Sequence, residues 1–339
     1  MKRLRTLWAF LKRENIHKIL IVLLLLIVVS SVGLAYFEPD IHYKDALWWS
    51  FVTVTTVGYG DISPTTLGGR VIGVAIMLIG IGILGMFTAT IASIFVENKI
   101  KTDKGMNSFD FTGHIILCEW NTRAREVIRE LRSDSRSEHI PIVLIADIDN
   151  KPLDDADLYF IKGNVSEETL QRANLAQAAT VVIMSDDRLD PVARDAKSVL
   201  STLTVETLNP DVYSIVELED EANVRHCRRA HADEIIVGAE FSTRLISRAA
   251  IDHGISKVMS ELLSTQFGND LYKIALPPAM AGKTFIDIFT EMKRNYQCTV
   301  LAVQRRDENE VIANPPCELV IDAEDALIVI AEHMPGQET

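Results

Sequence analysis

The segment TTVGYGD, residues 55–61, lies between two long apolar runs, and this position decides how the chain folds. The first run, Ile19 to Tyr36, is apolar except for two serines, and the second, Val71 to Val96, contains no charged residue. Because a helix needs about 20 apolar residues to cross a hydrocarbon core, each run predicts a membrane span. A signal peptide is the alternative for the first run, but the run is too long for one and no small-residue cleavage site follows it.

The residues between the two runs predict a short helix followed by a loop. The sequence YKDALWWSFVTVT, residues 43–55, suits a helix that is too short to cross a membrane. Trp48 and Trp49 suit a membrane interface. Non-helical backbone is tolerated at membrane depth only where it is buried in protein or lines a wet cavity. A span, a half-helix, a loop and a second span therefore predict a pore loop.

Basic residues flank the outer ends of the two runs. Six precede the first run and three follow the second, whereas residues 37–69 contain one basic residue, Lys44, against four acidic ones. Basic residues favour the cytoplasmic side, so both termini are expected in the cytoplasm, and the chain is expected in the cell (inner) membrane. The flanking basic residues are Lys2, Arg3, Arg5, Lys12, Arg13 and Lys18 before the first run and Lys99, Lys101 and Lys104 after the second.

The loop after the half-helix resembles the selectivity-filter signature of potassium channels. The resemblance implies that Thr56, Val57, Gly58, Tyr59 and Gly60 form a filter for K+ in a homotetramer. A potassium ion that sheds its water needs carbonyl oxygens aimed at one axis from four subunits, and glycine readily adopts the positive φ angles that such a loop requires. A β-turn is the ordinary alternative for a match this short, but the position between two spans favours the filter.

The second apolar run contains GIGILG, residues 80–85, which matches the pattern G-x-G-x-x-G. The dinucleotide-binding form of this pattern follows a strand in a β-α-β unit. We reject that interpretation because this copy lies inside a predicted span. Two interpretations remain, close helix packing through small residues and a flexible point at which the helix bends. Resemblance to ligand-gated potassium channels makes Gly80 the gating hinge.

Residues 99–112 are predicted to link the pore domain, residues 1–98, to a cytoplasmic half of different composition. From Gly113 onward, short apolar strands alternate with helices, which predicts a parallel, doubly wound sheet. The predicted strands are His114–Cys118, Pro141–Ala146, Tyr159–Ile161, Val181–Met184, Tyr213–Val216 and Glu234–Val237, and the predicted helices are Thr122–Arg132, Glu167–Arg172, Pro191–Leu203 and Glu221–Ala230.

This half resembles the RCK domain, the regulator of potassium conductance. The resemblance implies a Rossmann-like lobe over residues 113–250, then intermediate helices and a small α+β lobe over residues 251–339. It also implies that the domains pair into a ring, and that a second translation start at Met106 supplies additional RCK domains, with an ordinary linker methionine as the alternative. The stretches that carry the resemblance are His114–Asn121, Asp147, Gly163–Asn164, Ala173–Leu175, Val216–Val237 and Asp270–Glu332.

A nucleotide is one candidate for the ligand of this domain. The first strand-helix turn of a nucleotide-binding sheet is a glycine-rich phosphate cradle, but here the glycine positions hold Cys118, Trp120 and Arg123. Trp120 would block the approach of a pyrophosphate. Asp147 nevertheless stands where a ribose contact would be, and Arg123 is placed to meet a phosphate. NAD or an adenine nucleotide therefore stays a weakened alternative. The other interpretation of Asp147 is that it is an ordinary turn residue.

Calcium is the second candidate. Glu217 and Glu219 alternate at the end of a strand, so both carboxylates point to the same side. Calcium takes 6–8 oxygen ligands, so two carboxylates are only the beginning of a site. The chain resembles calcium-gated potassium channels here, and the resemblance makes Glu217 and Glu219 ligands, with a third from either Asp187 or Asp190. The alternative is a solvated acidic rim, since residues 107–339 carry 23 basic and 40 acidic side chains.

The sequence as a whole predicts a potassium-selective channel whose gate responds to a ligand, calcium first. The net charge of −13 excludes nucleic acid as a partner, because binding it requires basic residues; the expected partners are membrane lipid and further copies of the chain. Two other classes are a regulatory subunit of a potassium transporter, which would lack its own pore, and a membrane-anchored NAD-dependent oxidoreductase, which would need glycine at Cys118 and Trp120. We expect no enzymatic activity because no nucleophile–base pair is recognisable.

Overall fold

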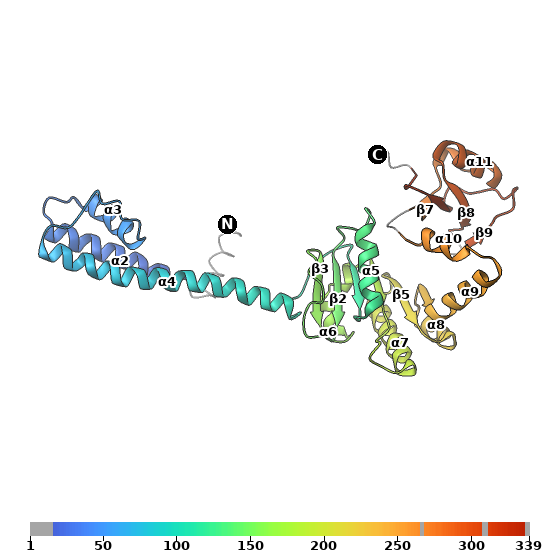
Figure 1. The fold of residues 1–339 in the computed structure, drawn as a ribbon, viewed down its shortest axis with the longest axis horizontal. Helices are drawn as coiled ribbons and strands as arrows, with labels where there is room; N and C mark the ends of the chain where they lie inside the picture. The colour runs from blue at the N-terminus through green and yellow to red at the C-terminus, as the bar shows by residue number, and fades with distance from the viewer. Residues whose placement is uncertain (1–15, 265–267, 307–310, 336–339) are drawn as a thin grey trace. The chain divides into compact units, whose positions relative to one another are not determined.

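The computed structural model describes residues 16–264, 268–306 and 311–335, and the chain divides into two units. One unit ends at Asp103 and the other begins at Lys104, and each is described by itself (Figure 1). Most of the basic residues on which the predicted orientation rests lie before Ile16, outside the described residues.

The first unit consists of two long apolar helices and a short one. Helices α2 (Ile16–Phe37) and α4 (Leu67–Asp103) are long and apolar enough to cross a membrane. Helix α3 (Tyr43–Val54) lies between them in the chain and packs against both. The small core of the unit includes Leu34 from α2 and Ile76 from α4. The predicted pattern of two spans with a pore helix is confirmed.

Helix α4 extends further than the sequence pattern predicts. It continues to Asp103, so residues 99–103 are helical where we expected a polar linker to begin. Lys99 and Lys101 are good helix formers, and Glu97 forms an i,i+4 ion pair with Lys101 at 2.6 Å. Gly105, with φ of +65°, follows the helix in a conformation that favours glycine after a helix end.

The second unit begins with a parallel sheet of six strands in the order β3-β2-β1-β4-β5-β6. Alternate residues of the strands face opposite sides, because side chains along a strand alternate. Ile116 and Cys118 face a core that includes Leu170 and Val205, whereas Leu117 faces a second core. The doubly wound α/β prediction is confirmed. The strands are β1 Ile115–Cys118, β2 Ile142–Ala146, β3 Leu158–Lys162, β4 Thr180–Ile183, β5 Tyr213–Leu218 and β6 Glu234–Val237.

Side-chain caps fix where several helices of this sheet domain begin. The Asn121 side chain accepts a hydrogen bond from the Ala124 amide at the start of α5, and Ser166 forms a capping box with Thr169 at α6. These caps place the helices directly after the strands. The helices and 3-10 turns are α5 Thr122–Ser133, α6 Glu167–Arg172, η1 Leu175–Gln177, α7 Pro191–Leu208, η2 Glu221–Asn223 and α8 Val224–Arg229.

The remaining residues form two helices and a small lobe. The lobe is a four-stranded antiparallel sheet in the order β7-β10-β8-β9 with one helix, α11, and its core includes Ile288, Val303 and Leu327. This confirms the predicted α+β lobe. The elements are α9 Gly238–Ile251, α10 Ile255–Leu262, β7 Asp270–Ala275, η3 Pro278–Met280, α11 Phe285–Tyr296, β8 Thr299–Gln304, β9 Val311–Ala313 and β10 Ala326–Ala331.

Candidate functional site

The loop after α3 has an alternating backbone. Thr56, Gly58 and Gly60 have φ angles of 63°, 57° and 75°, whereas Val57 and Tyr59 between them do not have positive φ. Positive φ is easy for glycine and unusual for threonine. An alternation of this kind is what lets successive carbonyl groups point to the same side of a loop. The sequence predicted positive φ for the two glycines, and the positive φ of Thr56 was not expected.

The loop is tied to the helix that precedes it. The amides of Val57 and Gly58 donate to the carbonyl of Val52 at 3.1 and 3.4 Å. The indole of Trp48 donates to Asp61 Oδ2 at 2.9 Å and stacks on the ring of Tyr59, with 5.9 Å between centroids. Helix α3 therefore holds both ends of the predicted filter segment.

Glu38, which the sequence pattern did not single out, holds the loop before α4. Its side chain is 5% exposed, and its Oε1 accepts from the backbone amides of Thr65 and Thr66, both at 2.7 Å. The hydroxyls of the same two threonines also donate to this carboxylate. In the sequence, a single acid next to a span looks like any other surface acid. Only evidence that position 38 pairs with Thr65 and Thr66 would have identified the role of Glu38.

Gly80 lies within α4 at a tight contact with α3. A Cβ on Gly80 would lie 2.8 Å from Val54 Cγ2 and 3.4 Å from Val54 Cα, whereas a Cβ on Gly82 or Gly85 would meet no atom within 4 Å. Contacts below 3.0 Å force a shift of one partner. Close packing therefore explains why position 80 is small, and its role as a hinge stays a prediction.

Three chain segments, α5, the loop after β4 and the end of β5, bring charged side chains together at the carboxyl end of the parallel sheet. Glu217 on β5 and Glu219 directly after it face the same guanidinium, that of Arg123 on α5. The Arg123 Nε lies 2.7 Å from Glu217 Oε1, and its Nη2 lies 2.8 Å from Asp187 Oδ1. Glu217 also accepts the amide hydrogen of Ser185 at 2.9 Å. The structure thus brings together Asp187, Glu217 and Glu219, the three predicted metal ligands.

Asp190, the alternative third ligand, caps a helix and does not face Arg123. Its side chain caps α7, where Oδ1 accepts from the amides of Val192 and Ala193 at 3.1 and 3.2 Å. Arg194, one turn later on α7, was missed in the sequence. Its guanidinium pairs with Glu219 at 3.0 Å and donates to the carbonyl of Leu189. Asp187 is therefore the acid of this loop that faces the cluster.

The carboxylates of the cluster are suitable calcium ligands in kind, because calcium prefers oxygen donors. The space between them, however, is filled by the Arg123 guanidinium. Over residues 16–264, 268–306 and 311–335, no group of three or more His, Cys, Asp or Glu side chains is arranged to hold a metal ion. A metal ion at this position would therefore require a rearrangement of Arg123.

The first strand-helix turn, where a nucleotide phosphate would lie, is filled by a buried side chain. Glu119, with φ of 71°, is 3% exposed and lies 2.6 Å from Lys197 Nζ. Lys197 and Arg188 both pair with Asp186, at 2.8 Å each. Burial raises the pKa of Glu119 against the effect of Lys197, while the Arg188 hydrogen bond holds the pKa of Asp186 far below its usual range.

The two predicted nucleotide contacts are engaged differently. Arg123 is bound to the carboxylate cluster, as described above. The Asp147 side chain is exposed at the end of β2, and its carbonyl accepts from Arg188 at 2.8 Å. Among the described residues, no hydrogen bond or ion pair joins Arg123 to Asp147.

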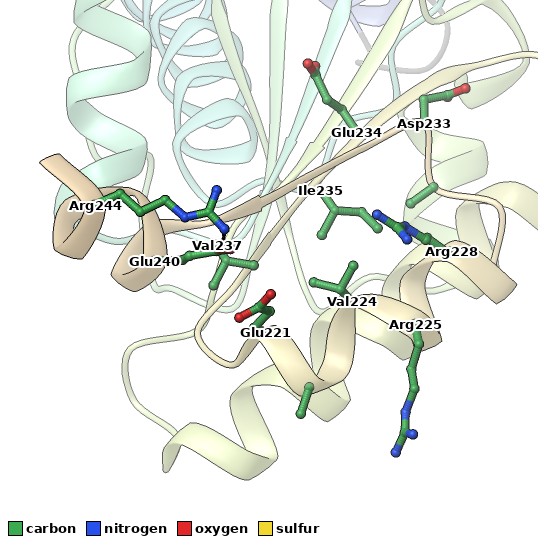
Figure 2. Close-up of a pocket in the computed structure, with 12 residues that line it drawn as sticks. Glu221, Val224, Arg225, Arg228, Asp233, Glu234, Ile235, Val237, Glu240 and Arg244 are labelled. Carbon is green, nitrogen blue, oxygen red and sulfur yellow. Dashed lines mark hydrogen bonds and ion pairs between the residues drawn. The ribbon is translucent and has the colours of Figure 1, made fainter. Parts of the chain in front are cut away.

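A separate cavity of about 800 Å³ lies beside the edge strand β6 (Figure 2). It is lined from η2, α8, β6 and α9 by side chains of both charges, among them Arg228 and Glu234, and Arg244 pairs with Glu240 on α9. Figure 2 shows Arg225 extending away from β6. None of the site residues predicted from the sequence lines this cavity. Its lining carries both positive and negative charges, which favours no single class of ligand.

Comparisons with known proteins match both units. Residues 21–97 match the ion channel family, and residues 110–216 match the family of calcium-activated potassium channel slowpoke-like RCK domains. The calcium-gated potassium channel TvoK of Thermoplasma volcanium is 31% identical over 98% of this chain and 97% of its own length. The putative potassium channel protein YugO of Bacillus subtilis is 27% identical over 97% of this chain and 100% of its own length.

Among solved structures, the human SLO3 gating ring matches with a TM-score of 0.53 at 18% identity, covering 65% of this chain and 44% of that one. That likeness concerns the fold. The pore match and the relatives at nearly full length support a channel over the transporter-subunit and oxidoreductase alternatives, since TvoK is a potassium channel and YugO a putative one. The chain belongs to the family of prokaryotic potassium channels that join a two-span pore to a C-terminal RCK domain.

Proposed function

We propose that four copies of the chain form a potassium-selective pore in the cell membrane, with residues 56–60 of each copy around one axis. The alternating φ angles of Thr56, Gly58 and Gly60 carry this proposal. Backbone carbonyl oxygens from four subunits replace the water shell of the ion. Both termini and the RCK domain lie on the cytoplasmic side, in line with the flanking basic residues.

Potassium flux into liposomes tests the pore. Purified full-length protein in liposomes should take up thallium, a potassium substitute, and should exclude sodium. Gly58→Ala should abolish the selectivity, because alanine at a φ of 57° strains the loop. Gly82→Ala is the control, since its Cβ would meet no atom. Thallium uptake at the background level, or equal passage of sodium, would contradict the proposal.

In this proposal the RCK domains pair into a ring that opens and closes the gate. Additional RCK domains are produced from a second translation start at Met106. A ligand shifts the gate only if it binds the two states of the ring with different affinity. Gly80 is the proposed point at which α4 bends. The continuous chain from α4 into the RCK domain supports this coupling, because α4 runs without a break to Asp103.

Calcium is the proposed ligand, held by Asp187, Glu217 and Glu219. Two observations support it: these three carboxylates converge, and the nearly full-length relative TvoK is a calcium-gated channel. When bound, calcium would supply two positive charges that draw the carboxylates together. We favour calcium over NAD or an adenine nucleotide because the buried Glu119 carboxylate stands where a phosphate would bind, and like charges repel.

A double substitution tests the ligand. Single channels of Glu217→Gln plus Glu219→Gln should lose their response to cytoplasmic calcium and keep their potassium selectivity, because the amides remove two charges from the proposed site. Glu221→Gln, an exposed acid on η2 close in sequence, should respond as the unmodified channel does. Calcium activation that is unchanged in the double variant would exclude this site.

A further inference from the structure

The chain between α4 and β1 is bound to the sheet domain along its length. Residues 105–113, the strap, run beside the segment that follows α6. The Phe109 amide of the strap donates to the carbonyl of Arg172 at 2.8 Å, and the Gly113 amide donates to the carbonyl of Gln177 at 2.8 Å. The strap is therefore hydrogen-bonded to the sheet domain before the chain enters β1.

Two side chains of the same segment hold the strap. The Arg172 guanidinium donates through Nη2 to the carbonyls of Gly105 and Asn107, at 2.6 and 2.9 Å. The Asn174 Nδ2 donates to the carbonyl of Phe111 at 2.9 Å. Asn174 has a φ of 57°, a conformation that asparagine adopts more readily than most residues. Side chains from one short segment thus bind three carbonyls of the strap.

Two aromatic side chains of the strap pack on β3. The rings of Phe109 and Phe111 stack on each other with 5.7 Å between centroids, and both contact Tyr159 on β3, at 5.1 and 4.4 Å. All three rings pack against the core of the sheet. Because aromatic side chains bury a large apolar area, these contacts stabilise the docked strap in addition to its hydrogen bonds.

The first strap residue is also the first point at which the chain after α4 is fixed. Gly105 is buried, and its carbonyl accepts from the Lys162 amide at 3.1 Å and from Arg172. Strand β1 begins only at Ile115. A pull that arrives through Lys104 therefore acts on Gly105 before it acts on β1.

We propose that Arg172 is the positioning residue that couples the RCK domain to the pore. It holds Gly105 and Asn107, so force passes between α4 and the end of α6, and β1 does not carry it. Asn174 keeps the rest of the strap docked behind this point. The inference rests on the proposed action of the RCK ring on the gate, and it holds for any ligand that moves the ring.

Two insertions in the full-length channel test where the force enters. Three extra residues, Gly-Ser-Gly, lengthen a connection by up to about 10 Å. Placed between Asp103 and Lys104, they lie before the Arg172 contacts, and single channels should lose most of the rise in open probability that cytoplasmic calcium causes. Placed between Thr112 and Gly113, they lie behind those contacts, and the channel should respond as the unmodified one does.

Substitutions of Arg172 test the residue itself. Arg172→Gln should also reduce the calcium response, and hydrogen exchange of the Lys162 amide, which donates to Gly105, should become about tenfold faster. Arg172→Lys keeps the charge without the planar fork and should restore part of both effects. Arg129→Gln, which removes a surface arginine that pairs with Glu126, should match the unmodified channel in both measurements.

The outcomes separate this inference from the proposed function. Equal loss of response with both insertions would show that force passes along the whole strap to β1, which overturns the role of Arg172 and leaves the action of the ring standing. No effect of either insertion would remove the action of the ring through this connection, and the role of Arg172 with it.

An unmodified channel that ignores calcium would exclude calcium as the ligand without deciding the role of Arg172. The two insertions are then compared by open probability without ligand. The insertion before Lys104 should change this open probability and the insertion before Gly113 should not. Equal values for the two would overturn the role of Arg172.

Discussion

Glu38 is a single side chain that connects the end of α2 to the loop before α4. Its carboxylate accepts four hydrogen bonds from Thr65 and Thr66, two from amides and two from hydroxyls. These bonds, the Thr66 amide first, hold the pKa of Glu38 below its usual range against the effect of burial. The charged form is therefore the one that holds the loop.

Glu38→Gln should lower the thermal stability of the channel at neutral pH, because the amide group is a weaker acceptor and carries no charge. Since the pKa of Glu38 is lowered in the folded protein, its contribution is present above the unfolded-state pKa and is lost as pH falls through the folded-state pKa. Thermal unfolding across pH measures this. Asp40→Asn, an exposed acid in the same loop, is the control, and equal Tm values for the two variants at pH 7 would contradict the role of Glu38.

His114 is buried at the start of the first strand. Its Nε2 lies 2.8 Å from the carbonyl of Ala173, which accepts the ring hydrogen. Burial lowers the pKa of His114 below its ordinary value of 6.5, against the effect of the Ala173 bond. The folded domain therefore holds a neutral imidazole.

The unfolding free energy should fall as pH drops below about 6.5, because the unfolded chain then binds a proton that folded His114 does not. The slope from this group is at most about 1.4 kcal/mol per pH unit. Denaturant unfolding of the full chain at pH 5 to 8 measures it, and His114→Gln should flatten the curve. His253→Gln, at an exposed site, should not. A slope that His114→Gln leaves intact would assign the pH dependence to another group.

At the scale of elements, the contact between α3 and α4 depends on Gly80. The pore helix ends against this glycine, and Val54 is almost fully buried there. The sequence showed a run of small residues but not which of them touches a neighbour. Gly82 and Gly85 belong to the same pattern and have open space beside them.

Gly80→Ala should destabilise the pore by about 1–3 kcal/mol through overpacking against Val54. Gly82→Ala should be neutral or slightly stabilising, because alanine favours a helix and meets no atom. Thermal dissociation of the proposed tetramer compares the two variants. If Gly80→Ala is as stable as Gly82→Ala but opens less often in single-channel records, position 80 acts as a hinge and not as a packing contact.

At the scale of the whole molecule, the chain between the two units is short. Helix α4 ends at Asp103, and the carbonyl of Gly105 already accepts hydrogen bonds from the Lys162 amide at 3.1 Å and from Arg172 at 2.6 Å. Only Lys104 separates the helix from this anchor. Because the connection is this short, we expect a movement of β3 to be transmitted to the end of α4.

Gly105→Ala should reduce the effect of calcium on channel opening. A Cβ there would lie 2.3 Å from the Lys162 nitrogen and 2.9 Å from the Phe160 ring, so the anchor must shift. Gly113→Ala is a matched control, since its φ of +67° is nearly the same and its Cβ meets no atom. Open probability against calcium concentration compares them. Identical curves would show that the anchor at Gly105 does not transmit the movement.

The sequence by itself determined the two spans, the TTVGYGD loop between them and the alternation of strands and helices that follows. These features are local, because hydropathy over 20 residues and the period of a strand or helix can be recognised within one segment. The sequence also proposed Asp187, Glu217 and Glu219 as neighbours, but it could not choose Asp187 over Asp190, because the choice depends on which of them caps α7.

The tertiary structure decided the contacts between distant segments. Arg123, a candidate phosphate contact in the nucleotide alternative, lies among three carboxylates from β5 and its end and from the loop after β4. Glu38 accepts hydrogen bonds from Thr65 and Thr66, although the whole pore helix separates them in the chain. Such pairs arise when sheet order and helix packing bring separate segments to one place, and no pattern within a single segment specifies them.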